Sequence, residues 1–204
     1  MEQIVIFTRY PEPGQTKTRL IPALGAEGAA KVHRKMADHT IATVRQLQQS
    51  RPLSAEVRFT GATRAQMTDW WGDDLSYSPQ GTGDLGDRMM EAAAVAFEKN
   101  CTAVVIIGTD CPAITPDLLA VAFDKLRESE VVFGPATDGG YYLIGLSRSL
   151  PELFRGIDWG TASVLQQSRT ICQTLNLSVA ELPPLTDIDR PEDLEMLDIA
   201  IEDG

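Results

Sequence analysis

The stretch from Ile4 to Leu20, IVIFTRYPEPGQTKTRL, constrains the fold of this chain more than any other segment. It begins as an apolar run of strand length and becomes, at Arg9, a loop with two prolines and a glycine. The loop carries three cations, Arg9, Lys17 and Arg19. A buried strand that ends in a basic loop before a helix is a common way to hold phosphate groups. The alternative is an ordinary strand–helix loop whose cations are solvated.

This loop lacks the two best-known phosphate-binding signatures. Neither the G-x-x-x-x-G-K-[ST] spacing of a Walker A loop nor the G-x-G-x-x-G fingerprint is present in it. The net charge of −11 argues against general nucleic-acid binding, which needs a basic face. The same acidity makes the local cluster of cations more informative, because an acidic protein that gathers three cations in one loop presents them to an anion.

Length and composition indicate a globular α/β protein with a single domain over residues 1–204. No window has the apolar length of a membrane span, and the N-terminus lacks a basic region ahead of an apolar signal core. We therefore expect a cytoplasmic protein. Three cysteines without a C-x-x-C pair predict reduced thiols. His33 and His39, six residues apart on a predicted helix, are expected at the surface rather than in a paired metal or catalytic role.

Apolar periodicity predicts strands that alternate with helices along the chain. The predicted strands are 4–8, 55–60, 75–78, 103–107, 130–135, 141–146 and 179–182. The predicted helices are 26–49, 63–71, a helix that begins at 84 or 87 and ends at 99, 116–128, 161–175 and 191–201. The run AVVII at 103–107 is typical of a central strand buried on both faces. The Asp138-Gly139 pair between two strand-like runs predicts a hairpin. The expected architecture is a Rossmann-like, mostly parallel twisted sheet with an antiparallel element and helices on both faces.

Charged and glycine-rich segments follow several of the predicted strands. The loop 81–86, GTGDLG, can bring backbone close to a ligand, although glycines also serve plain turns. Asp110 follows the central strand, where open parallel sheets bind ligands, and a helix cap is its alternative role. Asp187 and Asp189 form a second acidic pair, with a turn as the alternative. Two carboxylates that converge near cations suit a divalent metal bound to phosphate oxygens. The implied reaction is transfer to or from a nucleoside diphosphate or triphosphate.

Six motifs in order along nearly the whole chain resemble one family. They are FTRYPEPGQTKTRL, GDLGDRM, GTDCP, ATDGGYYLIGL, DWGT and DIDRPEDL. The chain resembles the bacterial glycosyltransferase-A-type (GT-A) nucleotide-diphospho-sugar transferases that are described as arsenosugar-biosynthesis-associated or selenodomain-associated. Wider relatives include phospholactate guanylyltransferase, whose opening loop also has a K-T-R-L run, and the nucleotidyltransferases of the molybdenum-cofactor and isoprenoid pathways.

This resemblance implies a GT-A fold, a nucleotide held by the first loop and the glycine loop, and a divalent metal, Mg²⁺ or Mn²⁺. The implied nucleotide-binding residues are Thr8, Arg9, Gly14, Lys17, Arg19, Gly83, Asp84 and Arg88. The implied metal ligands are Asp110, Asp187 and Asp189. The residues that would face the sugar or acceptor are Asp138, Gly139, Gly140, Tyr141 and Trp159. Catalytic roles would fall to Asp110, Asp138 and Lys17.

One motif departs from the glycosyltransferase pattern. Those enzymes usually carry Asp-x-Asp, whereas this chain has Gly108-Thr109-Asp110, a departure that resembles the nucleotidyltransferases. The leading hypothesis is a metal-dependent transferase that uses a nucleotide-sugar donor and a small-molecule acceptor. The alternative is a nucleotidyltransferase that joins a nucleoside monophosphate to a phosphorylated small molecule and releases pyrophosphate. A nucleotide-binding or regulatory protein on the same fold is a third hypothesis. A homodimer is compatible with the sequence, although no residue demonstrates one.

Overall fold

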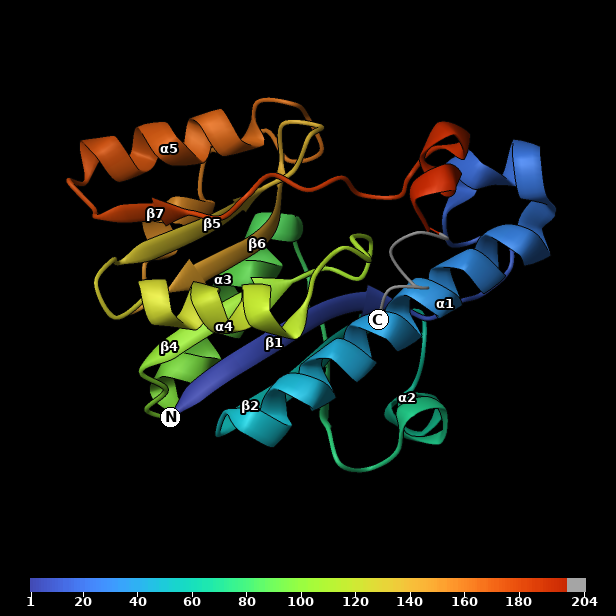
Figure 1. Ribbon diagram of the computed structural model, residues 1–204, viewed down its shortest axis with the longest axis horizontal. Helices are drawn as coiled ribbons and strands as arrows, with labels where there is room; N and C mark the ends of the chain where they lie inside the picture. The colour runs from blue at the N-terminus through green and yellow to red at the C-terminus, as the bar shows by residue number, and fades with distance from the viewer. Residues whose placement is uncertain (198–204) are drawn as a thin grey trace.

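The computed structural model describes residues 1–197 and is built around a seven-stranded sheet with helices on both faces (Figure 1). The strand order is β3-β2-β1-β4-β6-β5-β7. The strands are β1 (Glu2–Arg9), β2 (Leu53–Thr60), β3 (Ser76–Pro79), β4 (Ala103–Ile107), β5 (Val131–Pro135), β6 (Tyr141–Leu146) and β7 (Val179–Glu181).

Strand direction places the loops that matter at one edge of the sheet. β1 pairs in parallel with both β2 and β4, with Ile4 opposite Val105. β6 runs antiparallel to its neighbours β4 and β5, as the predicted hairpin required. The sheet is therefore mostly parallel, and the carboxyl ends of β1, β2 and β4 lie side by side. In open α/β sheets this edge is where ligands bind.

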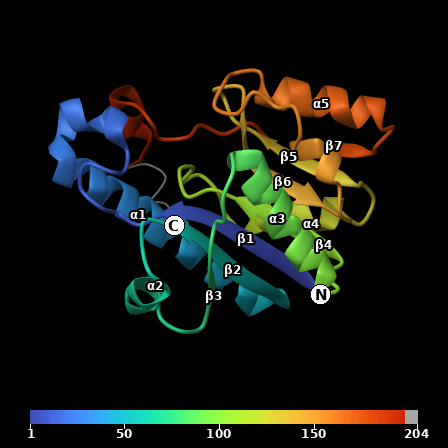
Figure 2. The same cartoon turned by 180° about the vertical axis from the view of Figure 1, so that it is seen from behind.

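The helices cover the sheet because each buries an apolar stripe against it. One face is covered by α1 (Ile21–Ser50), α2 (Arg64–Trp71) and α4 (Pro116–Lys125), whose buried side chains join one core cluster (Figure 1). Figure 2 shows the opposite face, where α3 (Leu85–Glu98), α5 (Val164–Thr174) and the short 3-10 helix Pro151–Phe154 pack over the second cluster. Full burial of a side chain such as Phe123 stabilises the fold by roughly 1.5–3 kcal/mol.

The predicted elements are confirmed, with shifts at their ends. Helix α1 begins five residues before the predicted position, at Ile21 instead of residue 26, and it bends at Gly25, where φ is +71°. Helix α5 begins at Val164, and Thr161 does not act as its cap. The predicted final helix, 191–201, begins with a 3-10 helix, Pro191–Asp193, and its end lies outside the described residues. Within residues 1–197, no helix combines the length and hydrophobicity that a membrane crossing needs.

Candidate functional site

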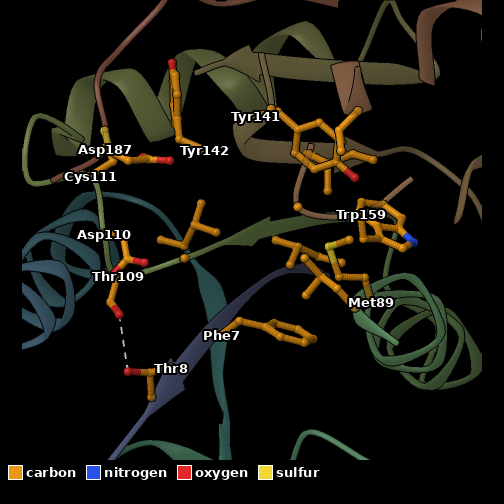
Figure 3. A pocket seen from close by; sticks show the side chains of 18 of the residues that line it. Phe7, Thr8, Met89, Thr109, Asp110, Cys111, Tyr141, Tyr142, Trp159 and Asp187 are labelled. Carbon is orange, nitrogen blue, oxygen red and sulfur yellow. Dashed lines mark hydrogen bonds between the residues drawn. The ribbon is translucent and has the colours of Figure 1, made fainter. Parts of the chain in front are cut away.

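A cavity of about 520 Å³ opens where β1 and β4 end, as Figure 3 shows from close by. Its lining falls into two chemically different parts. The charged half contains Thr8, Arg9, Arg19, His33, Thr109, Asp110, Asp138 and Asp187. The other part, which we call the apolar slot, contains Phe7, Leu85, Met89, Ile106, Tyr141, Ile144, Trp159 and Val164. Figure 3 separates the two, with Asp110, Thr109 and Asp187 on one side and Met89, Tyr141 and Trp159 on the other.

The side chain of Lys17 contacts residues from segments that are distant in sequence, beneath the charged half. Its backbone is left-handed, with φ and ψ both 47°, and its side chain is almost fully buried. The ammonium lies 2.9 Å from Oδ1 of Asp110 and donates a 2.6 Å hydrogen bond to the carbonyl of Ile188. Oδ1 of Asp189 lies 3.7 Å from it. The first loop, the end of β4 and the C-terminal segment are thus held at one buried cation.

Three arginines add positive charge to the cavity. Arg9 lines it and donates from Nη1 to the carbonyl of Gln15 at 2.8 Å. Arg19 also lines it, and its guanidinium is ion-paired with Asp189 while remaining two-thirds exposed. Arg88, from α3, donates to the carbonyl of Gly83 at 3.1 Å. Guanidinium groups held at a cavity rim are well suited to bind phosphate oxygens.

The carboxylates are crowded enough to repel one another. The pKa of Asp187 is raised to about 7, first by burial and then by the negative charges of Asp110 and Asp138, while Lys17 opposes the rise. Asp110 itself is about half exposed to the cavity. A further cation at this point would relieve the repulsion, and hard carboxylate oxygens are the ligands that Mg²⁺ and Mn²⁺ prefer. Asp110 and Asp187 therefore fit a divalent metal.

The protein would supply only part of a metal's coordination shell. Among residues 1–197, no group of three or more histidine, cysteine, aspartate or glutamate side chains is arranged to hold a metal. Two carboxylates suffice for Mg²⁺, because phosphate oxygens and water complete its six positions. Asp189, the third predicted ligand, does not line the cavity, and its carboxylate is paired with Arg19. Of the three predicted metal ligands, Asp110 and Asp187 are the two that line the cavity.

The predicted sugar or acceptor residues sit on the β5–β6 turn and beside it. Asp138 is exposed in the cavity, and its Oδ1 accepts a 2.8 Å hydrogen bond from the backbone of Gly140. Gly139 has a φ of +93°, and a Cβ there would lie 2.2 Å from the carbonyl oxygen of Ala162. Gly139 is thus required by the close approach of two backbones. Asp138, Gly140, Tyr141 and Trp159 line the cavity, and Gly139 does not.

Four predicted nucleotide-binding residues lie outside the cavity lining: Gly14, Lys17, Gly83 and Asp84. Asp84 caps α3, where it accepts a 2.9 Å hydrogen bond from the backbone of Asp87 and forms a capping box with it. Gly83 has a φ of +89°, and a Cβ there would lie 2.3 Å from Oδ2 of Asp87. These two residues shape the loop before α3, while Leu85, Arg88 and Met89 reach the cavity from α3 itself.

The prediction that His33 lies at the surface is wrong. The ring is buried, lines the cavity, and places Nε2 2.8 Å from the carbonyl of Arg9. Nδ1 lies 3.9 Å from Oδ1 of Asp110 and has no hydrogen-bond partner in the described part of the chain. Burial lowers the pKa of His33, against the opposing effect of Asp110. The signal was present, because His33 shares a helical stripe with buried Ala29 and Met36.

The sequence predicts a role for Thr8 but none for the cavity residues Gln80, Thr109 and Cys111. Gln80, directly after β3, donates from Nε2 to the carbonyls of Thr8 at 2.9 Å and Arg58 at 3.2 Å. The hydroxyls of Thr8 and Thr109 lie 3.3 Å apart and join the ends of β1 and β4 (Figure 3). Cys111 is buried beside Asp110, and burial raises the pKa of its thiol to about 12. For Gln80, Thr109 and Cys111, a position shortly after a strand is the feature that would have indicated a place in the cavity.

Comparison with known proteins identifies the family and the fold of this chain. The model of the family described as "Uncharacterized protein conserved in bacteria (DUF2064)" matches residues 43–161. No curated protein sequence matches the chain. A structure from Desulfovibrio desulfuricans G20, whose description as a nucleotide-diphospho-sugar transferase is provisional, is 28% identical with a TM-score of 0.87. The match covers 99% of this chain and 97% of that one.

Two more distant structures share the fold alone. CMP:2-keto-3-deoxy-manno-octonic acid synthetase in complex with CTP is 13% identical, with a TM-score of 0.61 over 100% of this chain and 99% of that one. Rv0371c of Mycobacterium tuberculosis H37Rv in complex with manganese is 15% identical, with a TM-score of 0.58 over 96% of each chain. The fold is therefore the Rossmann-like fold of nucleotide-diphospho-sugar transferases.

Proposed function

The chain belongs to the DUF2064 family of bacterial proteins, and from the charged half of its cavity we propose that it is a divalent-metal-dependent transferase. Its donor is a nucleotide-diphospho-sugar, and its acceptor is a small molecule. The observation that carries this proposal is the meeting of the buried Lys17 ammonium with Asp110, beside Asp187, at the shared edge of β1 and β4. Cations and paired carboxylates at one point match a metal-bound diphosphate.

The cations have the geometry to bind phosphate and stabilise a departing diphosphate. Arg9 reaches the cavity from the end of β1 and Arg19 from the 3-10 helix Thr18–Leu20, and Lys17 lies beneath them. Negative charge accumulates on the diphosphate as its bond to the sugar breaks, and fixed cations lower the energy of that state. Asp110 and Asp187 would hold Mg²⁺ or Mn²⁺, whose charge neutralises phosphate oxygens.

The acceptor side of the reaction would involve Asp138. Its carboxylate is exposed in the cavity and its orientation is fixed by the backbone of Gly140. A carboxylate in this position can accept a proton from an acceptor hydroxyl or hold sugar hydroxyls by hydrogen bonds. The proposal gains support from the Desulfovibrio structure, which is described as a nucleotide-diphospho-sugar transferase and resembles this chain over nearly its whole length.

Nucleotidyl transfer is a second candidate, favoured by a specific feature. β4 is followed by Gly108-Thr109-Asp110, with one carboxylate instead of two, and that carboxylate is in contact with a lysine. In this reaction a phosphate oxygen of the acceptor attacks the α-phosphorus of a nucleoside triphosphate, and pyrophosphate leaves. The complex of a protein of this fold with CTP is consistent with such a reaction.

Product analysis separates the two reactions. The protein would be incubated with each nucleotide-sugar and each nucleoside triphosphate, with Mg²⁺ or Mn²⁺, in the presence of a panel of small alcohols and phosphate esters. Glycosyl transfer releases a nucleoside diphosphate from a nucleotide-sugar, and nucleotidyl transfer releases pyrophosphate from a triphosphate. We expect the first product, and we expect Asp110→Asn to abolish it. Pyrophosphate alone would establish the second candidate, and neither product across both panels would contradict the proposed function.

A further inference from the structure

The apolar slot differs from the charged half in the charge and polarity of its side chains. Its floor is the sheet face that carries Phe7 of β1, Ile106 of β4 and Ile144 of β6, all three of which are buried. Its walls are Met89 of α3, Trp159 and Tyr141, which Figure 3 shows together across the cavity from Asp110. The slot is therefore a gap between α3 and α5 over the sheet, open toward Asp110.

Close packing fixes the aromatic wall. Gly86 allows this packing, because a Cβ at that position would lie 2.5 Å from Nε1 of Trp159. Trp159 is thereby held against the first turn of α3. The rings of Tyr141 and Trp159 meet edge to face, with centroids 6.4 Å apart and an interplanar angle of 88°. The slot is consequently pre-formed, which reduces the entropy lost when a ligand orders it.

The side chains of the slot offer few hydrogen-bonding groups, and the neighbouring polar residues Arg88 and Thr161, which also line the cavity, donate to the carbonyls of Gly83 and Asp158. Among its described residues the polar atoms are the hydroxyl of Tyr141 and the indole nitrogen of Trp159, which points toward α3. The Tyr141 hydroxyl is shielded from solvent and has no hydrogen-bond partner within residues 1–197, so Tyr141 presents its ring. A sugar ring placed here would leave several hydroxyl groups without partners, and each unpaired buried hydroxyl costs binding free energy. An aromatic or branched alkyl group would instead gain from burial.

We propose that the apolar slot binds the body of the acceptor, and that this acceptor is a small molecule with an aromatic or branched alkyl group and one polar end. This assignment rests on the proposed function, which gives the nucleotide the charged half. The chain sets the orientation, because β4 carries Ile106 on the slot floor and the segment directly after β4 carries Asp110 in the charged half. The hydroxyl or phosphate of the acceptor would thus face Asp110 and Asp138, and its apolar body would lie on Phe7 and Met89.

Two phosphate esters with different bodies test this directly. Phenyl phosphate and glucose 1-phosphate would be titrated into the wild-type protein by calorimetry, followed by a panel of nucleoside diphosphates with Mg²⁺. Val164→Phe fills the slot, because Val164 lines it from the start of α5. Val121→Phe is the matched control, since Val121 is exposed on α4. Met89→Gln makes the slot polar with little change in volume, and it serves if Val164→Phe fails to fold.

We expect phenyl phosphate to bind at least tenfold more tightly than glucose 1-phosphate. Val164→Phe or Met89→Gln should weaken the binding of phenyl phosphate at least tenfold and change the affinity for nucleotides less than twofold. Val121→Phe should change neither affinity. Glucose 1-phosphate that binds as tightly as phenyl phosphate, or phenyl phosphate affinity unaltered in both slot variants, would overturn the assignment. Slot-dependent binding of phenyl phosphate without binding of any nucleotide would support the slot and contradict the proposed function instead.

Discussion

The ammonium of Lys17 lies 2.9 Å from a carboxylate oxygen of Asp110, although one residue belongs to the first loop and the other follows β4. Lys17 is almost fully buried, whereas Asp110 is about half exposed to the cavity. The buried cation therefore anchors the carboxylate and leaves one face of it free for a ligand. The backbone reinforces the link, because the carbonyl of Asp110 accepts a 2.8 Å hydrogen bond from Ile188 and Lys17 donates to the carbonyl of Ile188.

Arg19→Ala should weaken nucleotide binding with little effect on folding. Arg19 lines the cavity and is largely exposed, so its loss removes a phosphate contact without opening the core. The expected loss is roughly 1.5–3 kcal/mol, the range for a hydrogen bond to a charged group. Calorimetric titration measures it, with Lys31→Ala on the exposed side of α1 as the control. Equal nucleotide affinity in Arg19→Ala and the control would exclude a phosphate role for Arg19.

Asp110→Asn should reduce the effect of Mg²⁺ or Mn²⁺ on nucleotide affinity more than it reduces metal-free binding. The substitution removes the negative charge that attracts a metal and keeps the shape of the side chain. Titrations with and without metal measure the difference, and Asp69→Asn, exposed on α2, is the control. An equal loss with and without metal, at matched folding stability, would point to a structural aspartate.

Asp187→Asn should stabilise the metal-free protein at alkaline pH but not at acid pH. The pKa of Asp187 is raised from 3.8 to about 7 by burial and by neighbouring carboxylates. The folded state therefore binds the proton more tightly than the unfolded state, and the wild-type protein loses stability as pH rises from about 4 to 7. The variant escapes this loss, so we expect it to gain about 2 kcal/mol at pH 8, after allowance for solvent screening, and almost nothing near pH 4.

Denaturant unfolding in the presence of a chelator measures this gain. Asp69→Asn is again the control, because Asp69 is exposed. Asp193→Asn, in the following 3-10 helix, would be a poorer control, because the carboxylate of Asp193 accepts hydrogen bonds from two backbone groups. If the stability difference between wild type and Asp187→Asn did not depend on pH, the surroundings of Asp187 would not raise its pKa.

His33→Gln should make the protein less sensitive to acid. Burial lowers the pKa of His33, so the unfolded state binds a proton more readily than the folded state. The wild-type protein therefore loses stability as pH falls from about 6.5 through the lowered pKa, and a neutral glutamine does not. The measurement is the free energy of unfolding at pH 8 and pH 5 for His33→Gln and for His39→Gln. An equal loss of stability between pH 8 and pH 5 in wild type and both variants would refute the lowered pKa of His33.

Gly139→Ala should destabilise the fold by at least about 2 kcal/mol. A Cβ at this position would meet the carbonyl oxygen of Ala162 at 2.2 Å, and φ is +93°. Gly108→Ala is the matched comparison, because a Cβ there meets none of the described residues within 4 Å and φ is not in the left-handed region. Thermal unfolding of both variants is the measurement. Equal midpoints would contradict the close approach of the β5–β6 turn to the segment before α5.

Hydrophobic periodicity was sufficient to predict the fold because the core residues repeat with the period of their element. The apolar run of β4 and the Asp138-Gly139 turn together indicated a parallel sheet with one antiparallel strand, as observed. The charged half followed from a simple rule, that ligands bind at the carboxyl ends of parallel strands. The sequence alone was therefore enough to expect Lys17, Asp110 and Asp187 near one another.

The remaining features depend on packing between elements that are distant in sequence. His33 lies on a helical stripe that the sequence shows to be apolar. The angle of α1 on the sheet determines which end of that stripe meets the first loop, and the sequence does not give this angle. The apolar slot exists because α3 and α5 leave a gap over the sheet, and no local pattern encodes a gap. The inward turn of Lys17 depends on its left-handed backbone, which the sequence did not indicate.

Thermal unfolding against nucleoside diphosphates, nucleoside triphosphates and nucleotide-sugars, with and without Mg²⁺ or Mn²⁺, tests the central claim most directly. A ligand at a hundred times its dissociation constant adds about 2.7 kcal/mol of stability, which is enough to move the midpoint visibly. We predict stabilisation by one nucleoside diphosphate and its sugars that is larger with metal, and we predict that the additional stabilisation by metal is lost in Asp110→Asn. A midpoint that no nucleotide shifts, with or without metal, would contradict a nucleotide site in this cavity.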